Sequence, residues 1–202
     1  IDRNVTTWVV HGLWPSIKSE IGPTFCNKSL PFNFDKIKWL LPRLLAFWPN
    51  LYTNTPLESF WQHEWEKHGT CALSLPQVRD ESDYFNVSLA LRDHYDFGPV
   101  LRASQIVPDD TMLYDVNKVR QAVQSVMGVQ PMLECYVLKD ADVQYFSQMQ
   151  VCVSKQFELV DCETRAVEPA LIVRNNEPQQ TQCLTTMPMH YPTLKYALRF
   201  VD

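Results

Sequence analysis

Apolar residues recur at helical spacing through residue 127 and then alternate with polar residues. The helical spacing predicts helices over residues 35–48, 57–69, 82–96, 100–104 and 115–127. Pro42 should kink the first of these helices, and Gly69 should end the second.

The helix over residues 115–127 has the most regular pattern, and Gly128 follows it as a stop signal. Its expected buried side is formed by Val116, Val119, Val123 and Val126. Aromatic residues of the earlier helices are expected in the core. In this prediction Trp61 and Trp65 pack their helix onto a sheet, while Trp39, Phe47 and Trp48 lie in the core.

Richness in β-branched and aromatic residues predicts a strand near the start of the chain, and alternation with polar residues predicts the later strands. They are expected over residues 5–10, 129–138, 143–154 and 157–161, with a further candidate over 171–174. The segment after Cys183 has too weak a pattern to assign. Helices that cluster before strands indicate an α+β fold in one domain, residues 1–202, rather than a doubly wound sheet.

The segment Phe-Trp-Gln-His-Glu-Trp-Glu-Lys-His-Gly-Thr-Cys, residues 60–71, gathers groups that can do chemistry. On an α-helix, with His63 at zero, Lys67 falls at about 40°, Glu64 at about 100° and His68 at about 140°. The four groups therefore share one face. A zincin needs two histidines four residues apart, so the five-residue spacing of His63 and His68 disfavours metal binding. A histidine beside a carboxylate and a histidine beside a lysine instead suit metal-free phosphoryl transfer.

A second segment, Trp-Val-Val-His-Gly-Leu-Trp-Pro at residues 8–15, places His11 at the end of the first expected strand. Rigid element ends are common positions for catalytic groups. Trp14 offers a flat face on which a nucleobase can stack, and Phe60 offers a second. Core packing is the alternative for both rings. Trp14 is the stronger candidate for stacking, whereas Phe60 suits either role equally.

Together these two segments resemble the ribonuclease T2 family, which are secreted or lysosomal endoribonucleases. The resemblance implies a central antiparallel sheet flanked by helices. It implies cleavage of single-stranded RNA to 2′,3′-cyclic phosphate and 5′-hydroxyl ends without a cofactor or metal. His11 and His68 would be the acid–base pair, and the sequence does not decide which is the base. Glu64 and Lys67 would stabilise the pentacoordinate phosphorus, and His63 would bind phosphate.

Six cysteines and three Asn-x-Ser/Thr sequons, at Asn4, Asn27 and Asn86, favour an oxidising, secretory history. Spacing alone does not choose among the possible pairings, and free buried cysteines are the alternative. The resemblance suggests the pairs Cys26–Cys71, Cys135–Cys183 and Cys152–Cys162.

The sequence departs from the family pattern at two places. Ser16 stands where family members usually carry an acidic residue that can bind a base, so base preference is open. Family members also have an upstream strand ending in Trp-Pro, whereas His11 lies only ten residues after the first residue given. We expect that strand to be a separate processed peptide or to have been lost.

The net charge of −5 disfavours a packaging role on long nucleic acid, which usually needs a basic protein. No apolar run is long enough for a membrane span. The sequence therefore predicts a monomeric endoribonuclease, secreted or lysosomal, that acts on RNA and not on membranes. The alternatives are a secreted signalling or binding glycoprotein that acts independently of catalysis, and a metal-dependent hydrolase.

Overall fold

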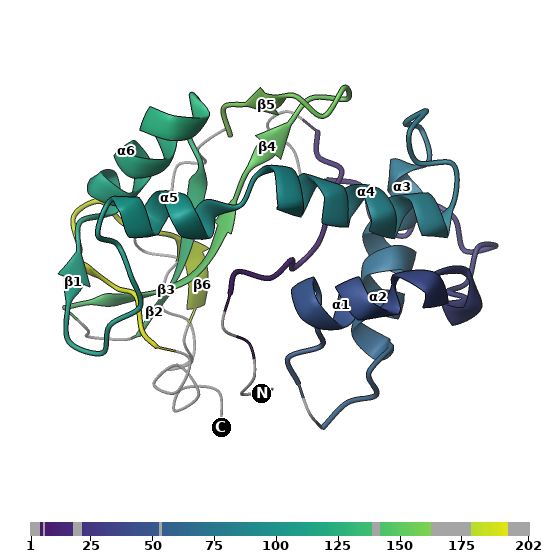
Figure 1. Cartoon of the computed structure of the whole chain (residues 1–202), viewed down its shortest axis with the longest axis horizontal. Helices are drawn as coiled ribbons and strands as arrows, with labels where there is room; N and C mark the ends of the chain where they lie inside the picture. The colour runs from purple at the N-terminus through teal and green to yellow at the C-terminus, as the bar shows by residue number, and fades with distance from the viewer. Residues whose placement is uncertain are drawn as a thin grey trace. The chain divides into compact units, whose positions relative to one another are not determined.

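The computed structural model describes residues 5, 7–17, 22–52, 54–138, 142–162 and 179–193. The chain divides into two compact units, residues 1–96 and 97–202. Figure 1 labels the helices and strands of both units. The expectation of one domain over residues 1–202 stays a prediction.

The first unit is helical in the residues that the structure describes. Its elements are η1 (Phe34–Lys36), η2 (Lys38–Leu40), α1 (Leu41–Phe47), α2 (Ser59–Glu64), η3 (Trp65–Gly69), α3 (Thr70–Ala72) and α4 (Glu81–His94). Asp80 caps α4 by accepting a hydrogen bond from the Asp83 N–H. The predicted helix over residues 82–96 is therefore confirmed, displaced by one or two residues at its ends.

The helix predicted over residues 35–48 is wrong in detail. It is two short 3-10 turns followed by α1, and Pro42 lies in the first turn of α1. In that position the missing N–H of proline costs nothing, so Pro42 helps to start a helix and does not kink one. Trp39 is 63% exposed instead of lying in the core. Its indole donates to the Ser82 hydroxyl, which a surface tryptophan can reach.

A cluster of buried aromatic rings forms the core of the first unit. Trp48 lies against Tyr84 and Phe85, with ring centroids 6.1 and 5.0 Å apart. Trp61 stacks with Phe34, and Trp65 packs on Tyr84. Trp61 and Trp65 are buried as predicted. The prediction that they pack on the sheet is not met by these ring contacts, which all lie within the first unit.

No strand forms in residues 7–10, so the strand predicted over residues 5–10 is wrong where the structure describes it. The backbone is held in other ways. The Val10 N–H donates to the carbonyl of Phe47 at the end of α1, and the Arg92 guanidinium donates to the Trp8 carbonyl. The apolar side chains that suggested a strand therefore belong to a segment that is hydrogen-bonded to residues of α1 and α4.

The second unit carries the sheet. Its elements are α5 (Phe97–Ala103), β1 (Leu113–Tyr114), α6 (Val116–Met127), β2 (Met132–Val137), β3 (Gln144–Gln150), β4 (Cys152–Val153), β5 (Leu159–Val160), β6 (Gln179–Gln182) and β7 (Met189–His190). The strand order is β1-β7-β3-β2-β6, and β4 and β5 form a separate hairpin. The described pairings are antiparallel except for β3 with β7, which is parallel, so the expectation of a central antiparallel sheet is confirmed apart from this one pair.

Helix α6 packs on β2, and α5 packs on α6, so helices flank the sheet as expected (Figure 1). Asp115 caps α6 through the N–H groups of the next turn, and Gly128 ends it with a φ of 76°. Val116, Val119 and Val123 are buried. Val126, in the last turn, is 64% exposed, whereas Ala122 is buried.

The strands are shorter than their predicted ranges. The run over residues 143–154 breaks between β3 and β4, and the run over 157–161 reduces to β5. Three strands were not predicted, β1, β6 and β7, and two of them have only two residues, too few to show alternation. The candidate over residues 171–174 lies outside the described residues.

All three expected disulfides are present, Cys26–Cys71 in the first unit and Cys135–Cys183 and Cys152–Cys162 in the second. Of the sequons, Asn27 is exposed and Asn86 is half-buried in α4, while Asn4 lies outside the described residues. The hydroxyl of Ser88, which belongs to the Asn86 sequon, is buried and donates to the Tyr84 carbonyl. Among the described residues, no helix is both long and apolar enough to cross a membrane.

Candidate active site

The helix that carries residues 60–71 changes its winding in the middle. It begins as α2, passes into a π-helical turn at η3 and continues as α3 to Ala72, so Gly69 does not end it. Gly69 is needed for a different reason, since a Cβ there would overlap the Trp65 ring. In a π turn, residues five apart replace residues four apart as neighbours along the helix. His63 and His68 therefore lie one turn apart, with ring centroids 6.4 Å apart, and not on opposite edges of a face.

Glu64 is the buried centre of the site, with 1% of its surface exposed. Its Oε2 accepts a hydrogen bond of 2.8 Å from the Trp14 indole, and its Oε1 lies 4.0 Å from Nε2 of His11. Burial raises the pKa of the Glu64 carboxyl, while the Trp14 hydrogen bond and the charges of His11 and Lys67 oppose that rise. The two sequence motifs thus meet at this one carboxyl group.

Gly12 allows this meeting. A Cβ at residue 12 would overlap both Oε2 of Glu64 and Nε1 of Trp14. The backbone at Gly12 therefore lies directly over the hydrogen bond that joins the two motifs, which gives the glycine after His11 a steric reason.

The two histidines of the helix sit in a cationic environment. Burial, followed by the Lys67 charge and the neighbouring imidazoles, lowers the pKa of His68 to about 4. Burial and the Lys67 charge also lower the pKa of His63 from its ordinary value. At pH values well above 4 the His68 imidazole is therefore neutral and able to accept a proton.

Aromatic rings line the His11 side chain. The Trp14 ring meets His11 edge-on at 4.8 Å between centroids and lies tilted against His68 at 5.3 Å. Phe60 lies 5.8 Å from His11. Both aromatic residues expected to bind a base are thus at the site, and Trp14 has its indole N–H already bonded to Glu64.

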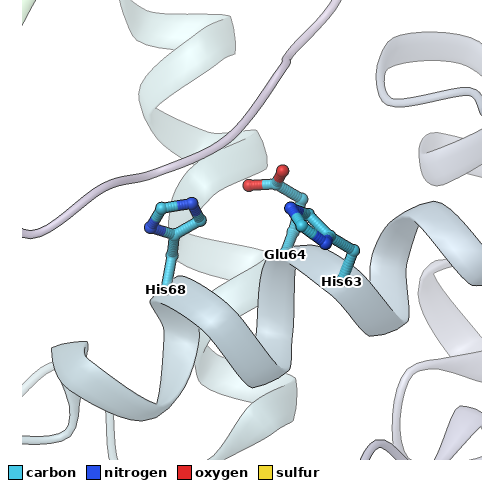
Figure 2. Close-up of side chains that lie close together, drawn as sticks. All are labelled: His63, Glu64 and His68. Atoms are coloured by element: carbon cyan, nitrogen blue, oxygen red, sulfur yellow. The ribbon is translucent and has the colours of Figure 1, made fainter. Parts of the chain in front are cut away.

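One group among the described residues has the spacing to hold a metal ion. The ligand atoms of His63, Glu64 and His68 lie within 4.8 Å of one another, and Figure 2 shows the three side chains on the same side of the helix. The argument from five-residue spacing against a metal is therefore wrong, because the π turn brings the two imidazoles together. The ammonium group of Lys67, which lowers the pKa of both histidines, still opposes a cation there.

The remaining sequence candidates lie elsewhere. Ser16 is exposed, and Cys71 is held in its disulfide with Cys26. His94 is exposed and contacts the Tyr95 ring. His190 is buried in the second unit, with Nε2 2.9 Å from the Asp109 carbonyl, which agrees with a structural role.

Sequence reasoning missed two residues that hold the His11 segment. Trp48 donates from its indole to the His11 carbonyl at 2.9 Å, and Tyr84 donates from its hydroxyl to the Leu13 carbonyl at 3.0 Å. Neither residue lies in a motif, and only a three-dimensional arrangement brings them to residues 11–13. The Phe25 N–H likewise donates to the Lys67 carbonyl at 2.8 Å.

The α+β fold thus carries a site in which two histidines, His11 and His68, lie around the buried carboxyl group of Glu64. A family model described as the ribonuclease T2 family matches residues 1–162. The chain therefore belongs to the ribonuclease T2 family, and it is an endoribonuclease.

Individual relatives agree with this assignment. The chain is 38% identical over 194 residues to ribonuclease Oy of Magallana gigas, which covers 95% of this chain and 86% of that protein. It is 39% identical over 166 residues to ribonuclease T2 of Homo sapiens, which covers 81% of this chain and 62% of that protein. The crystal structure of human RNase T2 matches with a TM-score of 0.72 at 34% identity, over 92% of this chain and 85% of that one.

Proposed function

We propose that the protein cleaves single-stranded RNA by metal-independent transesterification, with His68 as the base and His11 as the acid. The observation that carries this proposal is the array of His11, Glu64 and His68 around one space, beside Lys67. In support of an RNA substrate, a variant of RNase MC1 that is 30% identical to this chain was solved in complex with 5′-GMP.

The reaction needs one proton to leave and one to arrive. The His68 imidazole takes the proton of the 2′-hydroxyl, and the 2′-oxygen attacks phosphorus to form a pentacoordinate species. The bond from phosphorus to the 5′-oxygen then breaks, and His11 gives its proton to that oxygen. The products are a 2′,3′-cyclic phosphate and a free 5′-hydroxyl.

The environments of the two histidines fit these opposite roles. The lowered pKa of His68 keeps it unprotonated, as a base must be. The Glu64 carboxyl group lies 4.0 Å from Nε2 of His11, where it can orient the imidazole that gives its proton to the leaving oxygen. Lys67 and His63 stabilise the negative charge that develops on the phosphoryl oxygens, and Trp14 and Phe60 offer faces to the flanking bases.

The test is cleavage of a mixed-sequence single-stranded RNA in EDTA from pH 4 to 8, with the product ends identified. We expect cyclic phosphate ends from the natural protein and a loss of about a thousandfold or more in His11→Ala and His68→Ala. His94→Ala, which changes an exposed histidine, is the matched control and should keep full activity. Loss of activity in EDTA that zinc restores would contradict the proposal in favour of a metal-dependent hydrolase.

We further propose a secreted or lysosomal location for a monomeric glycoprotein, supported by the three disulfides and by the exposed sequon at Asn27. Endoglycosidase treatment should lower the mass of the natural protein. A biological effect that survives His11→Ala with His68→Ala would instead support the signalling alternative.

A further inference from the structure

The segment that carries His11 is held without a strand neighbour in residues 7–17. In its place, side chains from helices bind its carbonyl groups. The Trp48 indole donates to the His11 carbonyl at 2.9 Å, and the Tyr84 hydroxyl donates to the Leu13 carbonyl at 3.0 Å. The two bonds flank Gly12, which rests on the Trp14–Glu64 hydrogen bond.

Tyr84 is built to act as a fixed donor. Its side chain is fully buried, and its ring packs between Trp48 and Trp65 with centroids 6.1 and 5.9 Å away. Burial, together with the charge of Glu64, raises the pKa of the Tyr84 hydroxyl well above its ordinary value. The hydroxyl therefore keeps its proton and donates the hydrogen bond, which the Leu13 carbonyl accepts.

Tyr84 also touches the other half of the site. Its ring lies close to Gly69, where a Cβ would come within 3.1 Å of it, and against Trp65 of the π turn. One side chain of α4 thus contacts both the turn that carries His68 and the segment that carries His11.

We propose that Tyr84, assisted by Trp48, is a positioning residue that sets the placement of His11 relative to Glu64 and the π turn. This inference rests on the proposed function, because it assigns the placement of the proposed acid. The 4.0 Å separation of His11 Nε2 and Glu64 Oε1 is the distance that the two bonds maintain. Without the Tyr84 hydroxyl, the Leu13 carbonyl loses this bond, and of the two donors to residues 11–13 only the Trp48 indole remains.

The experiment compares Tyr84→Phe with Tyr114→Phe. Each variant removes one hydroxyl that donates to a backbone carbonyl, Leu13 in the first and Val107 in the second, and Tyr114 belongs to the second unit. We expect kcat to fall about ten- to a hundredfold in Tyr84→Phe with KM changed less than about twofold, because the acid is misplaced while substrate contacts remain. Tyr114→Phe should keep both constants.

A second measurement separates positioning from general loosening. The imidazole NMR signals of His11 should shift in Tyr84→Phe, while those of His94 and His190 stay in place. Equal thermal midpoints for the two tyrosine variants, with kcat lost in only one, support the proposal. A folded Tyr84→Phe protein with the kcat of the natural protein and unmoved His11 signals overturns it.

The outcomes also separate this inference from the proposed function. If the natural protein does not cleave RNA, the proposed function fails, while the His11 signals still show whether Tyr84 holds that residue. If Tyr84→Phe does not fold, Trp48→Phe removes the donor to the His11 carbonyl. Natural kcat and unmoved His11 signals in a folded Trp48→Phe protein then overturn the positioning role.

Discussion

Gly12 shows how a single residue decides whether the two halves of the site can meet. Any side chain there would occupy the space of the Trp14–Glu64 hydrogen bond. We expect Gly12→Ala to lower kcat about a hundredfold, since it separates His11 from Glu64. Gly128→Ala is a matched control with open space around the Cβ. It should lose about 1 kcal/mol of stability, because of its left-handed φ, and keep its activity. Equal activity loss in both variants would contradict this explanation.

A second prediction at the scale of one residue concerns Lys67 and the pH dependence of cleavage. Its charge contributes to the lowered pKa of His68, so removing that charge raises this pKa and lets His68 take up a proton at a higher pH. If His68 is the base, the acidic limb of the kcat/KM profile should move to higher pH by about 0.5 to 1 unit in Lys67→Gln. Lys28→Gln, a change at an exposed lysine, should leave the limb in place. An unmoved limb in Lys67→Gln would argue that another group is the base.

At the scale of elements, the helix over residues 59–72 shows where sequence reasoning succeeded and where it could not. The four chemical groups were assigned to one helical face, and the structure brings them together. The α-helical wheel, however, placed His63 and His68 about 140° apart, because a π turn has no sequence signature that distinguishes it from an α-helix. In this turn Trp65 packs on Tyr84, and Gly69 leaves room for the Trp65 ring, contacts that the sequence does not reveal.

The same limit explains the misplaced strand before His11. Residues 5–10 are rich in β-branched and aromatic residues, as strands are, but that composition shows only that a segment suits an extended, partly buried backbone. Whether its carbonyl groups meet another strand or a tyrosine hydroxyl depends on residues far along the chain, such as Tyr84. The longer helix over residues 116–127 needed no such partner, because its own cap at Asp115 and stop at Gly128 define it.

Glu81 links two elements of the first unit and makes their stability depend on pH. The buried carboxyl group accepts from the Asn33 N–H, and burial raises its pKa to about 7. Its protonated form is favoured in the folded state, so stability is full below about pH 4.5 and declines as pH rises toward 7. We expect Glu81→Gln to be more stable than the natural protein at pH 8 by about 1 kcal/mol, and equal to it at pH 4.

Urea unfolding at both pH values measures this difference. Glu58→Gln, which changes an exposed glutamate at the start of α2, is the control and should not alter the pH dependence. A Glu81→Gln protein that is less stable than the natural protein at pH 8 would show that the Lys36 ion pair outweighs burial.

At the scale of the whole molecule, disulfides cross-link each compact unit within itself, one in the first unit and two in the second, among them Cys135–Cys183. Cys26–Cys71 closes a separation of 45 residues in the first unit, and Cys152–Cys162 closes one of 10 residues in the second. The entropy of loop closure gives about 4 kcal/mol for the longer loop and about 3 kcal/mol for the shorter. Replacing each pair with alanine should therefore cost more stability in the first unit. Denaturant midpoints of the two double variants test this order, and the reverse order would contradict it.

The buried Ser88 hydroxyl limits when a glycan can be attached to Asn86. A glycan acceptor is ordinarily an accessible loop, whereas the sequon at Asn86 lies within α4 and its serine is bonded to the Tyr84 carbonyl. If a sugar chain is found on Asn86, it was added before α4 closed its turns. Asn27 lies on an exposed turn, so a glycan can be added there before or after folding. The ratio of sugar occupancy at these two asparagines therefore records whether α4 formed before or after the transferase reached it.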